Sequence, residues 1–189
     1  TLMHMHKSFW IQKRFFGDTN KENKDEIKKQ IENLEWELIE ATLKEQGKTS
    51  ALKKLEEFKR SNTKPFFLWR LNFADVFEDK GGFDVVIANP PYVRVDEIDD
   101  SFKIPYKKLF STAVGKYDLY YLFFEKSFYL LNSDGFCIFI SPNKFCAADS
   151  AFNLRRMMLE NMSIEEILST SKLKVFDTAS NYPVISSLG

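Results

Sequence analysis

The sequence Asn89, Pro90, Pro91, Tyr92 places two hydrogen-bond acceptors and an aromatic ring on one short stretch of chain. The side chain of Asn89 supplies one acceptor oxygen, and the backbone carbonyl of Pro90 supplies the other. Pro90 has no N–H and its ring restricts φ, so this carbonyl is held in a narrow range of directions. Two acceptors aimed at one point can take both N–H groups of an amino nitrogen and free its lone pair. The ring of Tyr92 offers a flat face for a planar base, and such stacking is worth about 1–3 kcal/mol.

The segment Phe83–Ala88 must position these four residues. It is an apolar run with β-branched residues at its centre, preceded by Gly81 and Gly82 and followed by Asn89 and two prolines. Short apolar runs bounded in this way are typical of buried strands in parallel sheets. Because neither proline can donate to a strand ladder, the strand must stop at Asn89. The four residues therefore lie at the carboxyl edge of a sheet, where open α/β folds bind ligands.

The composition is that of a globular protein without a basic field. The 189 residues are 44% hydrophobic and 29% charged, and their formal net charge is zero. A local basic patch or a separate DNA-reading domain stays open as a way of binding nucleic acid. Cys137 and Cys146 lie in an apolar strand and the loop after it, which favours a reduced, cytoplasmic protein. We expect no signal peptide and no membrane span, because no apolar run in these 189 residues is long enough to cross a membrane.

Residues 19–60 have a helical period and predict an antiparallel helical hairpin that Gly47 interrupts. Its charged outer faces are typical of a solvated surface. A role in tracking DNA is the alternative, because basic residues cluster at one end of the second helix: Lys53, Lys54, Lys59 and Arg60. His4 and His6 form an H-x-H pair, but no carboxylate or cysteine stands nearby to complete a metal site, so we expect none.

The rest of the chain alternates strands and helices, which favours a parallel or mostly parallel sheet. The predicted elements are a strand at 66–71, a loop at 93–114, a helix at 117–131, a strand at 136–140, a helix from 149 or 150 to 161, strands at 164–169 and 184–188, and a loop at 172–182. We expect the strands at 83–88 and 136–140 to be neighbours in one sheet, with the helix at 117–131 crossing between them.

From residue 66 onward the sequence resembles the gamma class of N6-adenine DNA methyltransferases. It is similar in particular to type IIG restriction–modification enzymes, which join methylation and cleavage in one chain. The matching segments stand in the family's order: LNFADVF, GGFDVVIANPPYVR, KYDLYYLFFEKSFYLLNSDGFCIFISPNKF, LRRMMLEN and KVFDTASNYPVIS. The helical hairpin before LNFADVF is a familiar insertion in that group. The resemblance implies a partial Rossmann-like methyltransferase sheet, mostly parallel with helices on both faces, preceded by that hairpin.

The resemblance also implies methyl transfer from S-adenosylmethionine to a target adenine that is flipped out of double-stranded DNA. It assigns roles as follows: Asn89, Pro90 and Tyr92 to catalysis; Tyr92 and Phe176 to stacking on the target base; Asn72, Phe73, Asn89, Pro91 and Phe123 to the cofactor. Asn72 departs from the aspartate that the family usually has there. Core packing is the alternative role for each of the three phenylalanines. Lys144, in SPNKF, is either a phosphate contact or an ordinary surface lysine.

The family's Gly-rich cofactor loop and its acidic ribose ligand are missing from this sequence. Gly81 and Gly82 precede the wrong strand and lack the G-x-G spacing. Because the chain begins at Thr1 rather than Met, we expect a piece of a longer protein, with these parts before it and a target-recognition domain after it. On this interpretation residues 1–63 form an N-terminal segment with the hairpin insertion, and residues 64–189 form the second half of the catalytic domain. We expect the piece alone to be inactive.

Other functions fit the same motif. Protein-glutamine methyltransferases of release factors and some RNA guanine methyltransferases also use N-P-P-Y, although they lack the long helical insertion and the KYDLYYLFFEKS helix. A non-catalytic, methyltransferase-like binding module is the remaining alternative. For the DNA-modifying enzyme we expect the cytoplasm of a bacterium or archaeon.

Overall fold

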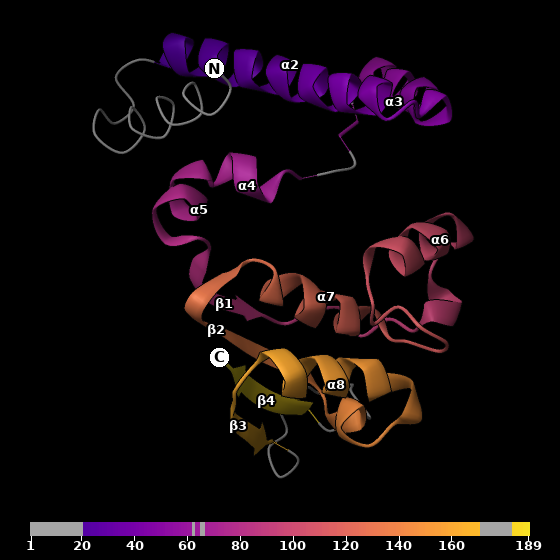
Figure 1. The fold of residues 1–189 in the computed structure, drawn as a ribbon, viewed down its shortest axis with the longest axis vertical. Coiled ribbons are helices and arrows are strands. Elements are labelled where there is room, and N and C mark those ends of the chain that lie inside the picture. The colour runs from indigo at the N-terminus through magenta and orange to yellow at the C-terminus, as the bar shows by residue number, and fades with distance from the viewer. Residues whose placement is uncertain (1–20, 62, 65–66, 171–182) are drawn as a thin grey trace. The chain divides into compact units, whose positions relative to one another are not determined.

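The computed structural model describes residues 21–61, 63–64, 67–170 and 183–189. The chain forms two compact units, Thr1–Asp79 and Lys80–Gly189, and each is described by itself (Figure 1). This division follows contacts in space, and the functional boundary between residues 63 and 64 stays a prediction. Among the described residues, no helix has both the length and the apolar character needed to cross a membrane.

The first unit contains the predicted helical hairpin. Helix α2 (Lys21–Glu45) and helix α3 (Thr49–Arg60) are joined by a turn in which Gly47 has a φ of +65°, a value that glycine adopts without steric cost. Ile31 on α2 and Leu55 on α3 are buried, with 5% of each residue exposed. The predicted pair of helices is confirmed, but the predicted apolar stripe of α2 is buried only at Ile31, and Leu38 on the same stripe is 49% exposed.

The predicted strand at 66–71 is wrong over its described part. The structure has helix α4 (Trp69–Asn72) there, followed by helix α5 (Ala74–Lys80). Leu71 and Ala74, three positions apart, are both buried, which is the spacing of one helical face. A short apolar run does not distinguish a buried strand from a buried helical segment, so packing within the unit decided this one.

The second unit is built on a four-stranded sheet in the order β1-β2-β4-β3. The strands are β1 (Phe83–Ala88), β2 (Leu131–Pro142), β3 (Ile164–Ser169) and β4 (Pro183–Leu188). β1 pairs with β2 in parallel, and β4 is antiparallel to both β2 and β3. Three strands therefore run in one direction and only β4 runs in the other, in a mixed α/β unit.

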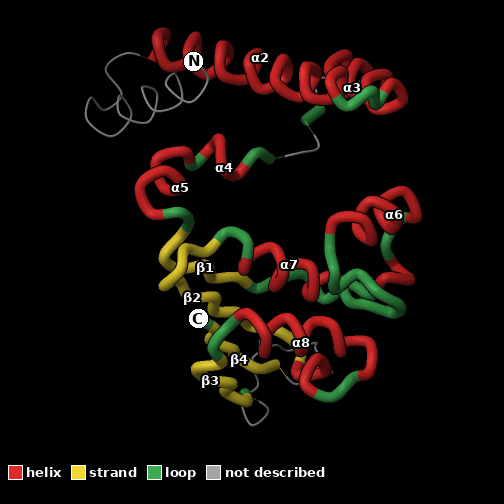
Figure 2. Tube along the Cα trace, in the orientation of Figure 1, coloured by secondary structure: helices red, strands yellow, loops and turns green. Residues whose placement is uncertain are grey.

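Two crossover helices pack against one face of this sheet (Figure 2). Helix α7 (Leu119–Phe128) connects β1 to β2, and helix α8 (Phe152–Asn161) connects β2 to β3. Both connections step in the same direction across the sheet, so right-handed crossovers place both helices on the same side. The hydrophobic core of this unit is made of large aromatic and aliphatic side chains from these helices, the sheet and the segments beside them. They include Tyr117, Tyr120, Tyr121, Phe124, Phe139, Phe145, Leu154 and Met158.

The opposite face of the sheet carries exposed apolar side chains. Val85 is 48% exposed, Ile87 is 73% exposed and Phe136 is 41% exposed. These residues alternate along their strands with the core residues, as side chains on a pleated strand must. A helical layer on this second face, which the predicted fold implies, stays a prediction.

The boundaries around α7 differ from the predicted ones. The helix begins at Leu119 and ends at Phe128, whereas the sequence predicted 117–131. β2 already begins at Leu131, and its register with β1 shifts between Phe83 and Val85. Gly82 permits this close approach, because a Cβ atom there would lie 2.5 Å from the carbonyl carbon of Leu131. The predicted loop at 93–114 contains the short turn η1 (Val95–Glu97) and helix α6 (Asp100–Leu109).

Candidate active site

The N-P-P-Y segment, residues 89–92, follows the carboxyl end of β1 as the sequence predicted. Asn89 and Pro91 are exposed, Pro90 is buried and Tyr92 is half-buried. Among the described residues, the Asn89 side chain makes no hydrogen bond, so its amide oxygen is open to a ligand. The buried Pro90 and the exposed Asn89 give the segment one anchored residue and one that faces solvent.

Tyr92 is held by two contacts within the unit. Its hydroxyl donates to the backbone carbonyl of Ile140 on β2, at 3.2 Å. Its ring meets Tyr120 edge-on, with 6.2 Å between the ring centroids and 72° between the ring planes. Burial raises the pKa of the Tyr92 phenol above its ordinary value, so the hydroxyl stays protonated and keeps donating at neutral pH. These contacts orient the ring and leave its hydroxyl committed to the protein.

The chain after Tyr92 pairs with the residues that lead into α7. The amide of Leu119 donates to the carbonyl of Val93 at 2.7 Å, and the amide of Val95 donates to the carbonyl of Tyr117 at 3.0 Å. Arg94 and Asp118 form an isolated antiparallel bridge between these two bonds. The pairing explains why α7 starts two residues later than predicted, and it fixes the trailing end of the N-P-P-Y segment.

Asp118 forms an ion pair with Lys144 beside this pairing. The Lys144 ammonium lies 3.0 Å from a carboxylate oxygen of Asp118; the Asp118 side chain is 8% exposed and the Lys144 side chain 50% exposed. Lys144 belongs to the turn η2 (Asn143–Cys146), which follows β2. The Arg155 guanidinium holds this turn by donating to the carbonyls of Phe145 and Ala148, each at 2.7 Å. Sequence reasoning singled out Lys144 but missed Asp118, whose only signal was its place in KYDLYY.

Glu125 is a second buried carboxylate that sequence reasoning missed. It is 1% exposed and accepts from the amides of Ser111 and Thr112, each at 2.8 Å, and from the Thr112 hydroxyl at 2.7 Å. These bonds tie the segment after α6 to the middle of α7. A single acidic residue within the apolar run LYYLFFEKSF was the signal that it needs internal partners.

The predicted cofactor residues fall in both compact units. Phe123 lies on α7 and is 41% exposed although most of its neighbours on that helix are buried. Asn72 and Phe73 belong to the first unit. The Asn72 amide donates to a buried Glu35 carboxylate oxygen at 3.2 Å and to the Leu68 carbonyl at 3.0 Å, and the Phe73 ring stacks on Trp69. Phe176 lies outside the described residues, so its role stays a prediction.

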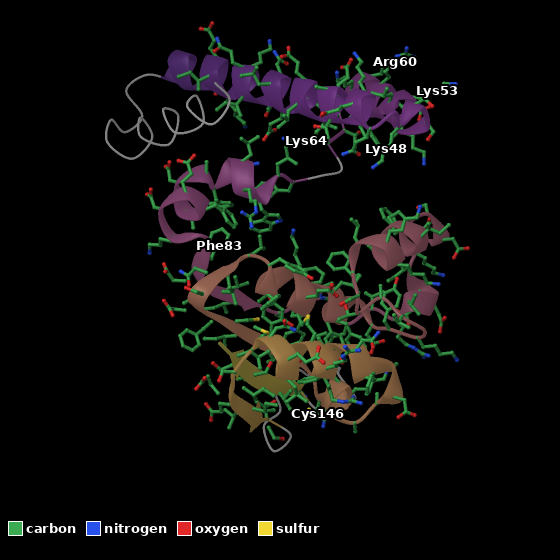
Figure 3. All side chains as sticks on the ribbon, in the orientation of Figure 1. Lys48, Lys53, Arg60, Lys64, Phe83 and Cys146 are labelled. Atoms are coloured by element: carbon green, nitrogen blue, oxygen red, sulfur yellow. The ribbon has the colours of Figure 1, made fainter. Side chains whose placement is uncertain are left out.

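Other candidate features of the sequence are less informative. Cys137 and Cys146 are both free thiols. In the described part of the chain, no three His, Cys, Asp or Glu residues come together as a metal site would require, and His4 and His6 lie outside that part. Lys53 and Arg60 are exposed on α3 (Figure 3), where Lys59 lies 2.6 Å from Glu40. The role of this cluster in tracking DNA stays untested.

The chain is similar to several type II restriction–modification proteins. It is 34% identical over 113 residues to the type II methyltransferase M.HincII of Haemophilus influenzae, which covers 57% of this chain and 22% of that protein. It is 35% identical over 109 residues to the type II methyltransferase M.TthHB8I of Thermus thermophilus, covering 54% of this chain and 23% of that protein. With the type II restriction enzyme and methyltransferase RM.Eco57I of Escherichia coli the identity is 29% over 103 residues, 53% of this chain and 10% of that one.

This chain thus spans between a tenth and a quarter of the length of these relatives. A solved structure from Listeria monocytogenes, described as a class I S-adenosylmethionine-dependent methyltransferase, superposes with a TM-score of 0.47 and 21% identity. It covers 57% of this chain and 31% of that one. The sequence profile of the Eco57I restriction-modification methylases matches residues 4–176, which is most of the chain. This chain therefore belongs to the Eco57I restriction-modification methylase family.

Proposed function

We propose that this chain carries the catalytic segment of an enzyme that methylates the N6 amino group of adenine in double-stranded DNA, within a restriction–modification system. The observation that carries the proposal is the exposed Asn89 at the carboxyl end of β1, followed by a Tyr92 that is anchored through its hydroxyl. The membership in a methylase family supports the same reaction.

The chemistry of the site follows from the acceptors that Asn89 and Pro90 provide. The adenine amino nitrogen is a poor nucleophile because its lone pair is delocalised into the ring. Hydrogen bonds from its two N–H groups to the Asn89 side-chain oxygen and the Pro90 carbonyl favour a tetrahedral nitrogen with a free lone pair. These bonds strengthen as the nitrogen becomes cationic, so they stabilise the transition state more than the ground state. Positioning of this nitrogen is then the main task of the protein.

We propose that residues of this chain form part of an S-adenosylmethionine site. This cofactor, when bound, supplies a sulfonium methyl group that is already activated for transfer. The ring of Phe123 is 41% exposed although its neighbours Leu122 and Phe124 are buried, as expected of an aromatic that packs against a cofactor adenine. Asn72 donates through its amide nitrogen to Glu35 and Leu68, which leaves its oxygen as an acceptor. We assign Asn89, Pro91 and Phe123, in the second unit, to this site, and Phe176 together with Tyr92 to the flipped target base. For Asn72 and Phe73, in the first unit, the cofactor role that the resemblance implies stays a prediction.

We expect the enzyme to include segments that are not part of this sequence. A Gly-rich cofactor loop and a target-recognition domain of the longer protein are its expected partners, and the isolated chain is expected to be inactive. A DNA substrate would place the enzyme in the cytoplasm of a bacterium or archaeon. The alternatives are methylation of guanine in RNA, methylation of glutamine in a protein, and a non-catalytic binding role. The test below separates them.

The proposal is tested by identifying the methylated product that the full-length protein forms. We expect radiolabelled methyl groups to pass from S-adenosylmethionine to duplex DNA, and mass spectrometry of the nucleosides to identify N6-methyladenine. Transfer to RNA or to a glutamine-containing protein in place of DNA would contradict the assignment. So would an absence of transfer to all three substrates under conditions where the protein binds duplex DNA.

The role of Tyr92 can be tested by removing first its hydroxyl and then its ring. Tyr92→Phe should lower the methylation rate mildly, because the ring remains and only the bond to the Ile140 carbonyl is lost. Tyr92→Ala should also lose base stacking, worth about 1–3 kcal/mol, or roughly 5- to 150-fold in rate. Single-turnover methylation of a cognate duplex measures both, and an Ala effect equal to the Phe effect would remove the stacking role.

A further inference from the structure

Asp118 lies at the centre of the contacts that hold the N-P-P-Y segment. Backbone hydrogen bonds flank it on both sides, from Leu119 to Val93 and from Val95 to Tyr117. Its side chain is 8% exposed, and Lys144 donates to its carboxylate at 3.0 Å. A carboxylate removed from water in this way is costly unless a cation and hydrogen bonds offset the loss of hydration.

The ion pair is one of three contacts that connect the end of β2 to the chain around Tyr92. Tyr92 is bonded through its hydroxyl to Ile140, near the end of β2. Lys144 follows shortly after on the same segment, and it is bonded to Asp118. Asp118 is bridged to Arg94, two residues after Tyr92. The segment from Ile140 to Lys144 therefore contacts the N-P-P-Y region at two points: directly at Tyr92, and through Asp118 at Arg94.

Arg155 also holds the turn that carries Lys144. Arg155 donates to two backbone carbonyls, those of Phe145 and Ala148. The turn is thus held from α8 as well as from Asp118.

We propose that Asp118 and Lys144 are positioning residues for the N-P-P-Y segment, which keep Asn89 and Tyr92 in the geometry needed for methyl transfer. This inference rests on the proposed function and adds two residues to it. It assigns the Lys144 ammonium to a carboxylate of the protein rather than to a DNA phosphate. Neither residue touches the reacting atoms, so their loss acts through the placement of Asn89 and Tyr92.

The experiment uses the full-length protein with Asp118→Asn, Lys144→Met and the double variant. Lys144→Arg keeps the charge, and Lys126→Met removes a lysine from the last turn of α7 as a matched control. We expect each single change to lower the single-turnover methylation rate about 10- to 100-fold, because small misplacements of a reacting group have effects of this size. DNA affinity should stay near that of the unmodified protein. Lys144→Arg and Lys126→Met should keep most of the rate.

Coupling between the two residues is the signature of a pair. The double variant should be no slower than the slower single variant, because the second change removes a partner that is already lost. The fluorescence of 2-aminopurine at the target position should fall in both single variants if the ring of Tyr92 is displaced and the flipped base is held less well. Effects that multiply in the double variant would show independent roles and overturn the proposal.

Two further outcomes separate this inference from its alternatives. If Asp118→Asn keeps the full rate while Lys144→Met weakens DNA binding and lowers the salt slope by about one, Lys144 is a phosphate contact and the proposal is wrong. Hydrogen exchange at the amides of Val95 and Leu119 measures the stability of the backbone pairing beside Asp118 and requires no methylation activity. The exchange rate should rise in Lys144→Met. An unchanged rate would overturn the proposal, even if the protein methylates no DNA.

Discussion

Replacing Asn89 with alanine should lower single-turnover adenine methylation by about 100- to 1,000-fold, which is the usual effect of losing one preorganised transition-state hydrogen bond. The change removes the exposed amide oxygen at the carboxyl end of β1 and leaves the Pro90 carbonyl as the sole acceptor of the pair. Because the lost bond strengthens as the nitrogen becomes cationic, the effect should appear in the methylation rate constant at saturating DNA. Single-turnover kinetics on a cognate duplex, with DNA binding measured separately, gives both quantities.

Asn143→Ala is the matched control for this experiment. Asn143 is also exposed, and it follows a proline at the carboxyl end of β2, the strand beside β1. It provides no acceptor next to the N-P-P-Y backbone in our assignment, so its replacement should leave the rate nearly unchanged. Equal rates for Asn89→Ala and the unmodified protein, or equal losses in both variants, would refute the role given to Asn89.

Glu125→Ala should destabilise the segment after α6 by about 2 kcal/mol or more, because an unsatisfied buried donor costs about 1–3 kcal/mol and the two donors of buried Thr112 lose their acceptor, together with one donor of exposed Ser111. The donors are the amides of Ser111 and Thr112 and the Thr112 hydroxyl. We expect the loss to appear first as local opening, since the bonds join a connecting segment to the rigid helix α7. Hydrogen exchange followed by mass spectrometry should show the two amides losing their protection in the full-length protein.

Glu160→Ala is the corresponding surface control. Glu160 lies on α8 and is 2.8 Å from Arg156, with more than half of each side chain exposed. Exposed ion pairs of this kind contribute between zero and about 1 kcal/mol, so exchange at Ser111 and Thr112 should not change. If Glu125→Ala also left their exchange unchanged, the buried carboxylate would not be what holds this segment.

Elements with strong local signals were predictable from the sequence. The strand Phe83–Ala88 has the bounds that its flanking residues indicated, because Gly81 takes a φ of +79° before it and the prolines cannot extend it. The hairpin of α2 and α3 followed from its apolar period. The segment at 66–71 was predicted as a strand because its apolar run has no period of its own, and burial of Leu71 and Ala74 on one side favoured a helix.

The sequence by itself determined which groups the candidate site offers: an amide oxygen, a proline carbonyl and an aromatic ring after a strand that has to end there. Only the tertiary structure decided what holds these groups in place. Asp118 and Lys144 are 26 positions apart, and Glu125 lies 13 and 14 positions from its partners. Local patterns extend over a few residues, whereas these pairs form because the crossover from β1 through α7 to β2 brings three separate segments together beside the sheet.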